Sequence, residues 1–125
     1  MKTYHSDQAP AAIGPYSQAV RTGSLLFCSG QTPTIPGTKE LKGRTIEEQT
    51  EQALKNIQAV LASAGLSLAN VVKTTVFLKN FADFSRMNET FATAFGDHRP
   101  TRSTVEVSRL PLDCLVEIEA IASFD

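Results

Sequence analysis

The 125-residue sequence is poor in cysteine and histidine, has no tryptophan and carries almost no net charge. Two cysteines and two histidines, none at the spacing of metal ligands, predict that there is no zinc site. Twelve basic residues oppose thirteen acidic ones, which gives a formal charge of −1. A chain with this balance is not held to nucleic acid or anionic lipid by bulk electrostatics, so any partner must be recognised by a local site.

Long apolar runs are also missing. No segment approaches the roughly 18 apolar residues of a membrane span, and no apolar signal-peptide core follows the first residues. We therefore expect a cytoplasmic protein. Cys28 and Cys114 lie inside short apolar runs, where a reduced cysteine packs as a small hydrophobic side chain. We expect both to be buried and not joined in a disulfide.

The residues that are present suffice for one folded domain. Hydrophobic residues make up 42% of the chain and charged residues 20%, a composition that excludes disorder. A chain of this length buries roughly two thirds of its unfolded surface and has no room for a second core. Residues 1–125 are therefore predicted to form a single domain with a core of mostly Val, Leu, Ile and Ala.

The hydrophobic pattern predicts regular elements in the order ββαβαββ. Thr45 begins the clearest helix with a capping-box pattern completed by Glu48, and Gly65 ends it. In the second helix, phenylalanines and a methionine recur every three or four residues, which is typical of a core-facing helix. The strands are predicted at 16–20, 25–29, 71–79, 103–107 and 115–123, and the helices at 45–64 and 81–95. An α+β fold with a single mixed sheet and both helices on one face is the simplest packing.

Alternation along the strands assigns side chains to the two sheet faces. In the strand at 71–79, one face is predicted to carry Val72, Thr74, Val76 and Leu78. In the last strand, the helix side is predicted to carry Val116, Ile118, Ala120 and Ala122. Glu117 then points to the other face, and we expect Arg102 of the preceding strand to share that face. A sheet face that mixes apolar and ionic residues is often covered by another copy of the chain, so we predict a homo-oligomer.

Arg102 and Glu117 are the candidate catalytic residues. The planar guanidinium of arginine binds a carboxylate through two parallel hydrogen bonds, and a carboxylate such as Glu117 can exchange a proton with a bound water. The alternatives are an arginine in an ordinary surface ion pair and a solvent-facing glutamate. Tyr16 and Ser29 add hydroxyl groups, and Gly30 lets a ligand approach the backbone, although each also fits a hairpin or a strand end. Phosphate-binding loops and nucleophile elbows are absent from the sequence.

Separated motifs run nearly from end to end of the chain. They are APAAIGPYSQ at 9–18, SGQ at 29–31, VKTTVF at 72–77, PTRS at 100–103, VEV at 105–107 and VEIEAIA at 116–122. Together and in this order they resemble the reactive-intermediate deaminase (Rid, YjgF-type) family. The resemblance implies a chorismate-mutase-like α+β fold, a homotrimer whose sheets line a central barrel, and ligand clefts between adjacent subunits.

The resemblance also implies an activity. Members of the deaminase branch hydrolyse unstable imines and enamines, such as 2-iminobutanoate and 2-iminopropanoate, to 2-oxo acids and ammonia without a cofactor or metal. In that branch the residue matching Arg102 grips the substrate carboxylate, and the residue matching Glu117 handles the attacking water. The positions expected to bind substrate are Tyr16, Ser29, Gly30, Asn88, Ser103 and Thr104. Many members have cysteine where this chain has Thr104. A contact through the backbone N–H would be kept by threonine, whereas a thiol that tunes the pocket shape or is modified would imply a different activity or substrate range here.

Two other functions stay open at this point. One is the endoribonuclease or translation-inhibitor activity ascribed to some of the family, and the other is a non-catalytic small-ligand or regulatory module. RNA cleavage commonly uses histidines or a metal and a basic face with stacking aromatics. His5 lies near the N-terminus and His98 is expected to be a solvated loop residue. The presence of both Arg102 and Glu117 favours an enzyme, and we expect neither nucleic acid nor membrane as a partner.

Overall fold

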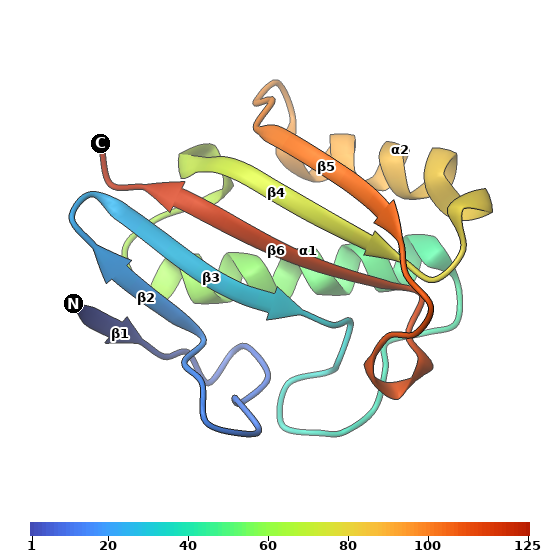
Figure 1. Cartoon of the computed structure of the whole chain (residues 1–125), viewed down its shortest axis with the longest axis horizontal. Coiled ribbons are helices and arrows are strands. Elements are labelled where there is room, and N and C mark those ends of the chain that lie inside the picture. Colours follow the sequence, from blue (N-terminus) through green and yellow to red (C-terminus); the bar gives the residue numbers. More distant parts are fainter.

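The computed structural model describes all residues from 1 to 125, and its centre is one six-stranded sheet. The elements are β1 (Lys2–Tyr4), β2 (Ala19–Thr22), β3 (Leu25–Gln31), α1 (Ile46–Ser63), β4 (Val71–Leu78), α2 (Phe84–Phe95), β5 (Thr101–Glu106) and β6 (Val116–Ser123), with short 3-10 helices η1 (Leu68–Asn70), η2 (Phe81–Asp83) and η3 (Pro111–Asp113). Across the sheet the order is β1-β2-β3-β6-β4-β5, and only β4 and β5 run parallel. Both α-helices cover the same face of the sheet (Figure 1).

This architecture confirms the predicted α+β fold, with one mixed sheet and two helices on one face. The prediction missed β1, which is too short to show a period-two pattern. It also began the next strand too early, because residues 16–18 belong to a loop. The Gln18 side chain is 2% exposed and hydrogen-bonds the backbone of Ser6 and Pro10, so this segment packs against the N-terminal loop and does not extend β2.

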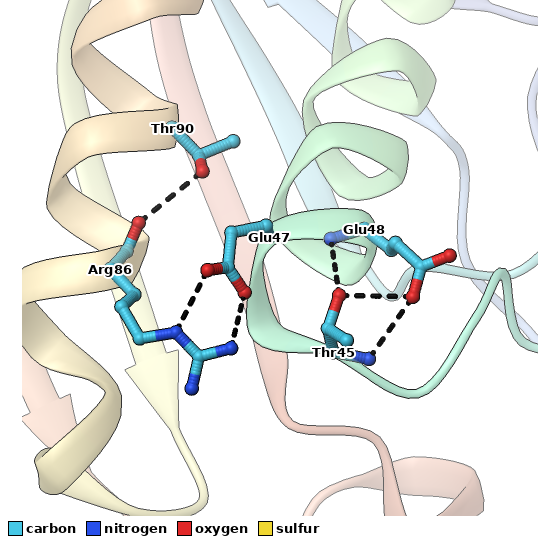
Figure 2. Close-up of polar contacts among 5 residues, drawn as sticks. All are labelled: Thr45, Glu47, Glu48, Arg86 and Thr90. Carbon is cyan, nitrogen blue, oxygen red and sulfur yellow. Dashed lines mark hydrogen bonds and ion pairs between the residues drawn. The ribbon is translucent and has the colours of Figure 1, made fainter.

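Helix α1 begins and ends where the sequence predicts. The Thr45 side chain accepts a hydrogen bond from the Glu48 backbone N–H at 3.1 Å, and the Glu48 carboxylate accepts one from the Thr45 N–H at 3.3 Å. These bonds satisfy two N–H groups that have no partner inside the helix (Figure 2). At the other end Gly65 adopts a φ of 76°, a conformation that favours glycine and turns the chain out of the helix.

An ion pair joins α1 to α2. The Glu47 carboxylate accepts hydrogen bonds from Arg86 Nε at 2.8 Å and from Arg86 Nη2 at 2.6 Å (Figure 2). The hydrogen bonds from Arg86 lower the pKa of the Glu47 carboxyl. Both side chains are largely exposed, so the pair contributes little to the free energy of unfolding, but its two-bond geometry favours one alignment of the helices.

The helix-facing side of the sheet forms the hydrophobic core. In β6 the predicted inward residues are all buried, namely Val116, Ile118, Ala120 and Ala122. The prediction for β4 is wrong at one position, because Val72 is 43% exposed and Val71 is buried in its place. The β4–β6 register shifts between Val71 and Lys73, and this irregularity reverses the alternation at the start of the strand. Cys28 and Cys114 are free and buried as predicted, and burial raises the pKa of Cys28 to about 12 and of Cys114 to about 11.

The opposite side of the sheet, which we call the open face, is not covered within one chain. Leu25, Phe27 and Val105 remain 37%, 44% and 42% exposed there, and they alternate with polar side chains such as Lys73 and Glu119. None of the helices is long and apolar enough to cross a membrane. The cytoplasmic location expected from the sequence stays a prediction.

Candidate active site

Glu117 is half-buried on the open face, close to the middle of the sheet. It lies opposite Phe77 in the β4–β6 ladder, and its carboxylate lies against the backbone of Gly30. A Cβ atom built on Gly30 would be 2.2 Å from Glu117 Oε2, so only glycine leaves room for the carboxylate at this place. Burial, followed by the nearby charge of Glu119, raises the pKa of Glu117. A carboxylate in this environment is a stronger base than an exposed one.

Ser29 adjoins Gly30 in the chain, and the loop that contains Tyr16 is bonded to Ser29. Ser29 precedes Gly30, where the β3–β6 register shifts, and its Oγ donates a hydrogen bond to the Ser17 carbonyl at 2.7 Å. Its backbone N–H donates to the Gln18 carbonyl at 2.9 Å, so the segment that follows Tyr16 is tied to β3. The Tyr16 side chain is 54% exposed. We refer to Tyr16, Ser29, Gly30 and Glu117 as the glutamate half-site.

Arg102 lies on the other side of the sheet, on the edge strand β5. Its ladder partner in β4 is Thr74, whose side chain is buried under the helices, so Arg102 also points to the helix side. The guanidinium carbon is 4.9 Å from the centroid of the Phe91 ring and 5.6 Å from that of Phe84. Burial lowers the pKa of Arg102. The side chain takes part in none of the three ion pairs of the chain.

Two further predicted residues belong to this side. Asn88 is half-buried and lies four residues after Phe84 and three before Phe91, which places it on the same face of α2. Thr104 follows Arg102 by two residues and therefore also points to the helix side, where its hydroxyl is buried without a hydrogen-bond partner. We refer to Phe84, Asn88, Phe91, Arg102 and Thr104 as the arginine half-site.

The prediction that Arg102 and Glu117 share the face away from the helices is therefore wrong. The two strands are not neighbours, because β4 lies between β5 and β6. The β4 partners of the two residues, Thr74 and Phe77, are three positions apart, so the side chains point to opposite faces. Two strand spacings and three residues along a strand separate their Cα atoms by roughly 14 Å. Ser103 alternates with Arg102 and points to the open face.

A hollow on the open face lies apart from these residues. It has a volume of about 110 Å³, and none of the predicted site residues lines it. Its lining residues are Phe27, Cys28, Lys73, Thr75, Glu119, Ala120 and Ile121. Because the two half-sites lie on opposite faces of the sheet, one small ligand could contact both only if they came from different copies of the chain.

Sequence reasoning missed the part played by the phenylalanine stripe. It assigned these side chains to the core, which holds for Phe91 at 6% exposure, but Phe84 is only half-buried and lies near Arg102. Since β4 and β5 are parallel neighbours joined through α2, the crossover places α2 over both strands. This regularity of strand–helix–strand units could have indicated that Phe84 and Phe91 of α2 lie near Arg102 of β5. The expectation for His98 also needs correction, because its Nε2 is 2.6 Å from the Val71 carbonyl oxygen and the residue is half-buried.

Comparison with known proteins adds an independent finding. A family model described as endoribonuclease L-PSP matches residues 6–124. A RutC family protein of Pyrococcus horikoshii is 53% identical over 94% of this chain and 93% of its own length. The 2-iminobutanoate/2-iminopropanoate deaminase of Escherichia coli K12 is 46% identical over 97% of this chain and 96% of its own. The crystal structure of E. coli TdcF with bound serine is 43% identical, covers 98% of both chains and has a TM-score of 0.93.

Proposed function

The chain belongs to the endoribonuclease L-PSP family, as its resemblance to the Rid (YjgF-type) proteins indicated, and from this premise we propose that it is an imine and enamine deaminase. The proposed substrates are small 2-imino acids such as 2-iminobutanoate and 2-iminopropanoate, which the enzyme hydrolyses to 2-oxo acids and ammonia. The E. coli relative named for this activity supports the proposal, and so does the serine bound by E. coli TdcF, because serine also carries a carboxylate beside a carbon–nitrogen bond.

One observation carries the proposal. The chain holds an arginine that has no carboxylate partner and a glutamate that burial makes more basic, and these are the two groups that hydrolysis of a 2-imino acid requires. Within one chain Arg102 and Glu117 lie on opposite faces of the sheet. We therefore propose a homotrimer in which the arginine half-site of one subunit meets the glutamate half-site of its neighbour.

The open face supports this assembly. Its Leu25, Phe27 and Val105 side chains are apolar, and a monomer would leave them in water. Arg102 lies on the edge strand β5, which has a neighbouring strand on one side only and so can meet another subunit on the other. Closing three copies around their sheets would bury the apolar side chains and bring each edge against the next open face.

The proposed chemistry is orientation followed by proton transfer. The Arg102 guanidinium holds the substrate carboxylate through two parallel hydrogen bonds. Glu117 takes a proton from water as the water oxygen bonds to the imine carbon. The C=N electron pair moves to nitrogen, which takes up that proton from Glu117. The resulting carbinolamine gives its hydroxyl proton to Glu117, which passes it to nitrogen as the C–N bond breaks. The 2-oxo acid forms, ammonia leaves, and Glu117 is again a carboxylate.

The remaining predicted residues would shape the pocket. On the arginine half-site, Asn88 and Thr104 would border the carboxylate. On the glutamate half-site, Tyr16 and Ser29 would supply hydroxyl groups, and the Gly30 backbone would allow the substrate to approach. Ser103 points to the open face and would contact substrate only through its backbone or across the subunit boundary.

The test couples a pyridoxal-phosphate-dependent amino-acid dehydratase to this protein and measures how much imine semicarbazide traps. We expect the wild type to reduce trapping and to elute as a trimer in size-exclusion chromatography with light scattering. Arg102→Lys keeps the positive charge but cannot give two parallel hydrogen bonds to a carboxylate. We expect about a 10- to 100-fold loss of kcat/KM, which corresponds to one lost charge-assisted hydrogen bond. Arg86→Lys is the matched control, because Arg86 pairs with Glu47 on the surface and is expected to leave activity unchanged.

If adding the wild type leaves the amount of imine trapped by semicarbazide unchanged, the deaminase proposal is rejected. If Arg102→Lys and the wild type are equally active, the proposed role of the arginine is rejected. The description of the family as an endoribonuclease calls for one parallel assay of RNA cleavage. We expect none, because the formal charge is −1 and His98 is bonded to the Val71 carbonyl. Cleavage that persists through purification and is lost in Glu117→Gln would favour the ribonuclease instead.

A further inference from the structure

The chain holds two arginines against helix α2 in opposite ways. Arg86 donates two hydrogen bonds to Glu47, so two of its guanidinium N–H groups are already in use and its charge is neutralised (Figure 2). The Arg102 guanidinium has no carboxylate within ion-pair distance and lies near the rings of Phe84 and Phe91. Of these two arginines, Arg102 is the one whose charge remains available to a ligand.

The contact of Arg102 with the two aromatic rings leaves its hydrogen-bond donors free. Its distances to the ring centroids, 4.9 Å for Phe91 and 5.6 Å for Phe84, are within the range of a cation–π interaction. Such an interaction attracts the charge without using an N–H donor, so the five donors of the guanidinium remain available. A carboxylate neighbour would hold the side chain equally well, but it would compete with an anionic ligand for the same donors.

The two rings also form a firm support. Phe91 is 6% exposed, so burial in the core fixes its ring, and Phe95 lies beside it at a centroid distance of 4.5 Å. Phe84 stacks on Phe81 at 5.1 Å, which limits its movement at the surface. Arg102 itself is partly withdrawn from water, which strengthens a charge-assisted hydrogen bond to a ligand.

We propose that Phe84 and Phe91 are positioning residues, which orient the Arg102 guanidinium toward the carboxylate of the substrate. This inference rests on the proposed deaminase function. It assigns the phenylalanines no contact with the reacting atoms. Their loss should weaken binding of the carboxylate in the ground state and in the transition state alike, and so raise KM with little change in kcat.

The first experiment compares two buried phenylalanines of α2. Pyruvate, a 2-oxo acid, is the binding probe, and its dissociation constant is measured by calorimetry together with kcat and KM of the deaminase. We expect Phe91→Leu to weaken pyruvate binding about 3- to 30-fold and to raise KM in parallel, with kcat within about twofold of the wild type. Phe95→Leu is the matched control, because Phe95 is 7% exposed on the same helix and makes no cation–π contact with Arg102. It should lose similar thermal stability and keep its affinity.

The second experiment uses the half-buried Phe84, which can be replaced without opening the core. Phe84→Leu is measured in the wild-type background and in Arg102→Gln, with pyruvate affinity followed by NMR titration. We expect a loss of affinity in the wild-type background, rescue by Phe84→Tyr, which keeps the ring, and no further loss in Arg102→Gln. Such coupling distinguishes positioning of the arginine from a general effect on folding.

Equal losses for Phe91→Leu and Phe95→Leu, or the same loss for Phe84→Leu in both backgrounds, would overturn the inference. These outcomes would leave the deaminase proposal intact, because the wild type would still bind pyruvate and hydrolyse the imine. A wild type that does neither would overturn both proposals.

Discussion

Replacing Gly30 with alanine tests the position of the Glu117 carboxylate directly. The new Cβ would lie 2.2 Å from Oε2, and ordinary contact begins at 3.4 Å, so the carboxylate must move by about 1 Å to make room for it. The φ angle of Gly30 is outside the left-handed region, so alanine can adopt the same backbone conformation. The substitution therefore displaces the proposed base without straining the chain.

We expect Gly30→Ala to lose activity but not stability. A displacement of about 1 Å from reactive geometry can cost on the order of 100-fold in rate, and we expect kcat/KM to fall by about that factor. The clashing atom is the end of a flexible side chain, so the new rotamer costs about 0.5–1.5 kcal/mol. Alanine recovers about 0.5–1 kcal/mol in a strand relative to glycine, and the melting temperature should stay within about 3 °C of the wild type. The assays are semicarbazide trapping and thermal unfolding followed by circular dichroism.

The matched control is Gly23→Ala, in the turn between β2 and β3. Gly23 has a φ of 58° and no atom within 4 Å of the added Cβ, so alanine is strained there but touches nothing. It should lower stability by about 1 kcal/mol and leave kcat/KM unchanged. The reasoning fails if folded Gly30→Ala keeps kcat/KM within about threefold of the wild type.

Two further predictions concern stability. Burial raises the pKa of Glu117 above its ordinary value of 4.5, so the stability that it contributes is present below this pH and is lost as the pH rises through the raised pKa. Glu117→Gln should therefore raise the melting temperature more at about pH 8 than at about pH 4, and an equal change at both would contradict the burial of the carboxylate. Thr50 of α1 is fully buried, and its hydroxyl has no hydrogen-bond partner. Thr50→Val should stabilise the fold by about 1 kcal/mol, or about 3–5 °C in the melting temperature, whereas a loss of stability would show that the hydroxyl is bonded after all.

The regular elements could be predicted because their signals are local. The capping box at Thr45, the stop at Gly65 and the alternation from Val116 to Ala122 all depend on residues a few positions apart, and each is present in the structure. The bulge that buries Val71 and exposes Val72 depends on the register with β6 and has no signal within β4 itself.

The amino-acid pattern alone identified the family, both α-helices and the five longer strands, and it proposed both candidate catalytic residues, because spacing and residue type suffice for these. Only the tertiary structure decided that β6 pairs with β3 and β4, that Arg102 points toward α2, and that Glu117 lies against Gly30. Strand order is set by pairings between residues far apart in the chain, and alternation within one strand does not show which of its faces is covered. For this reason the sequence pattern placed Arg102 and Glu117 on the same face, whereas the structure places them on opposite faces.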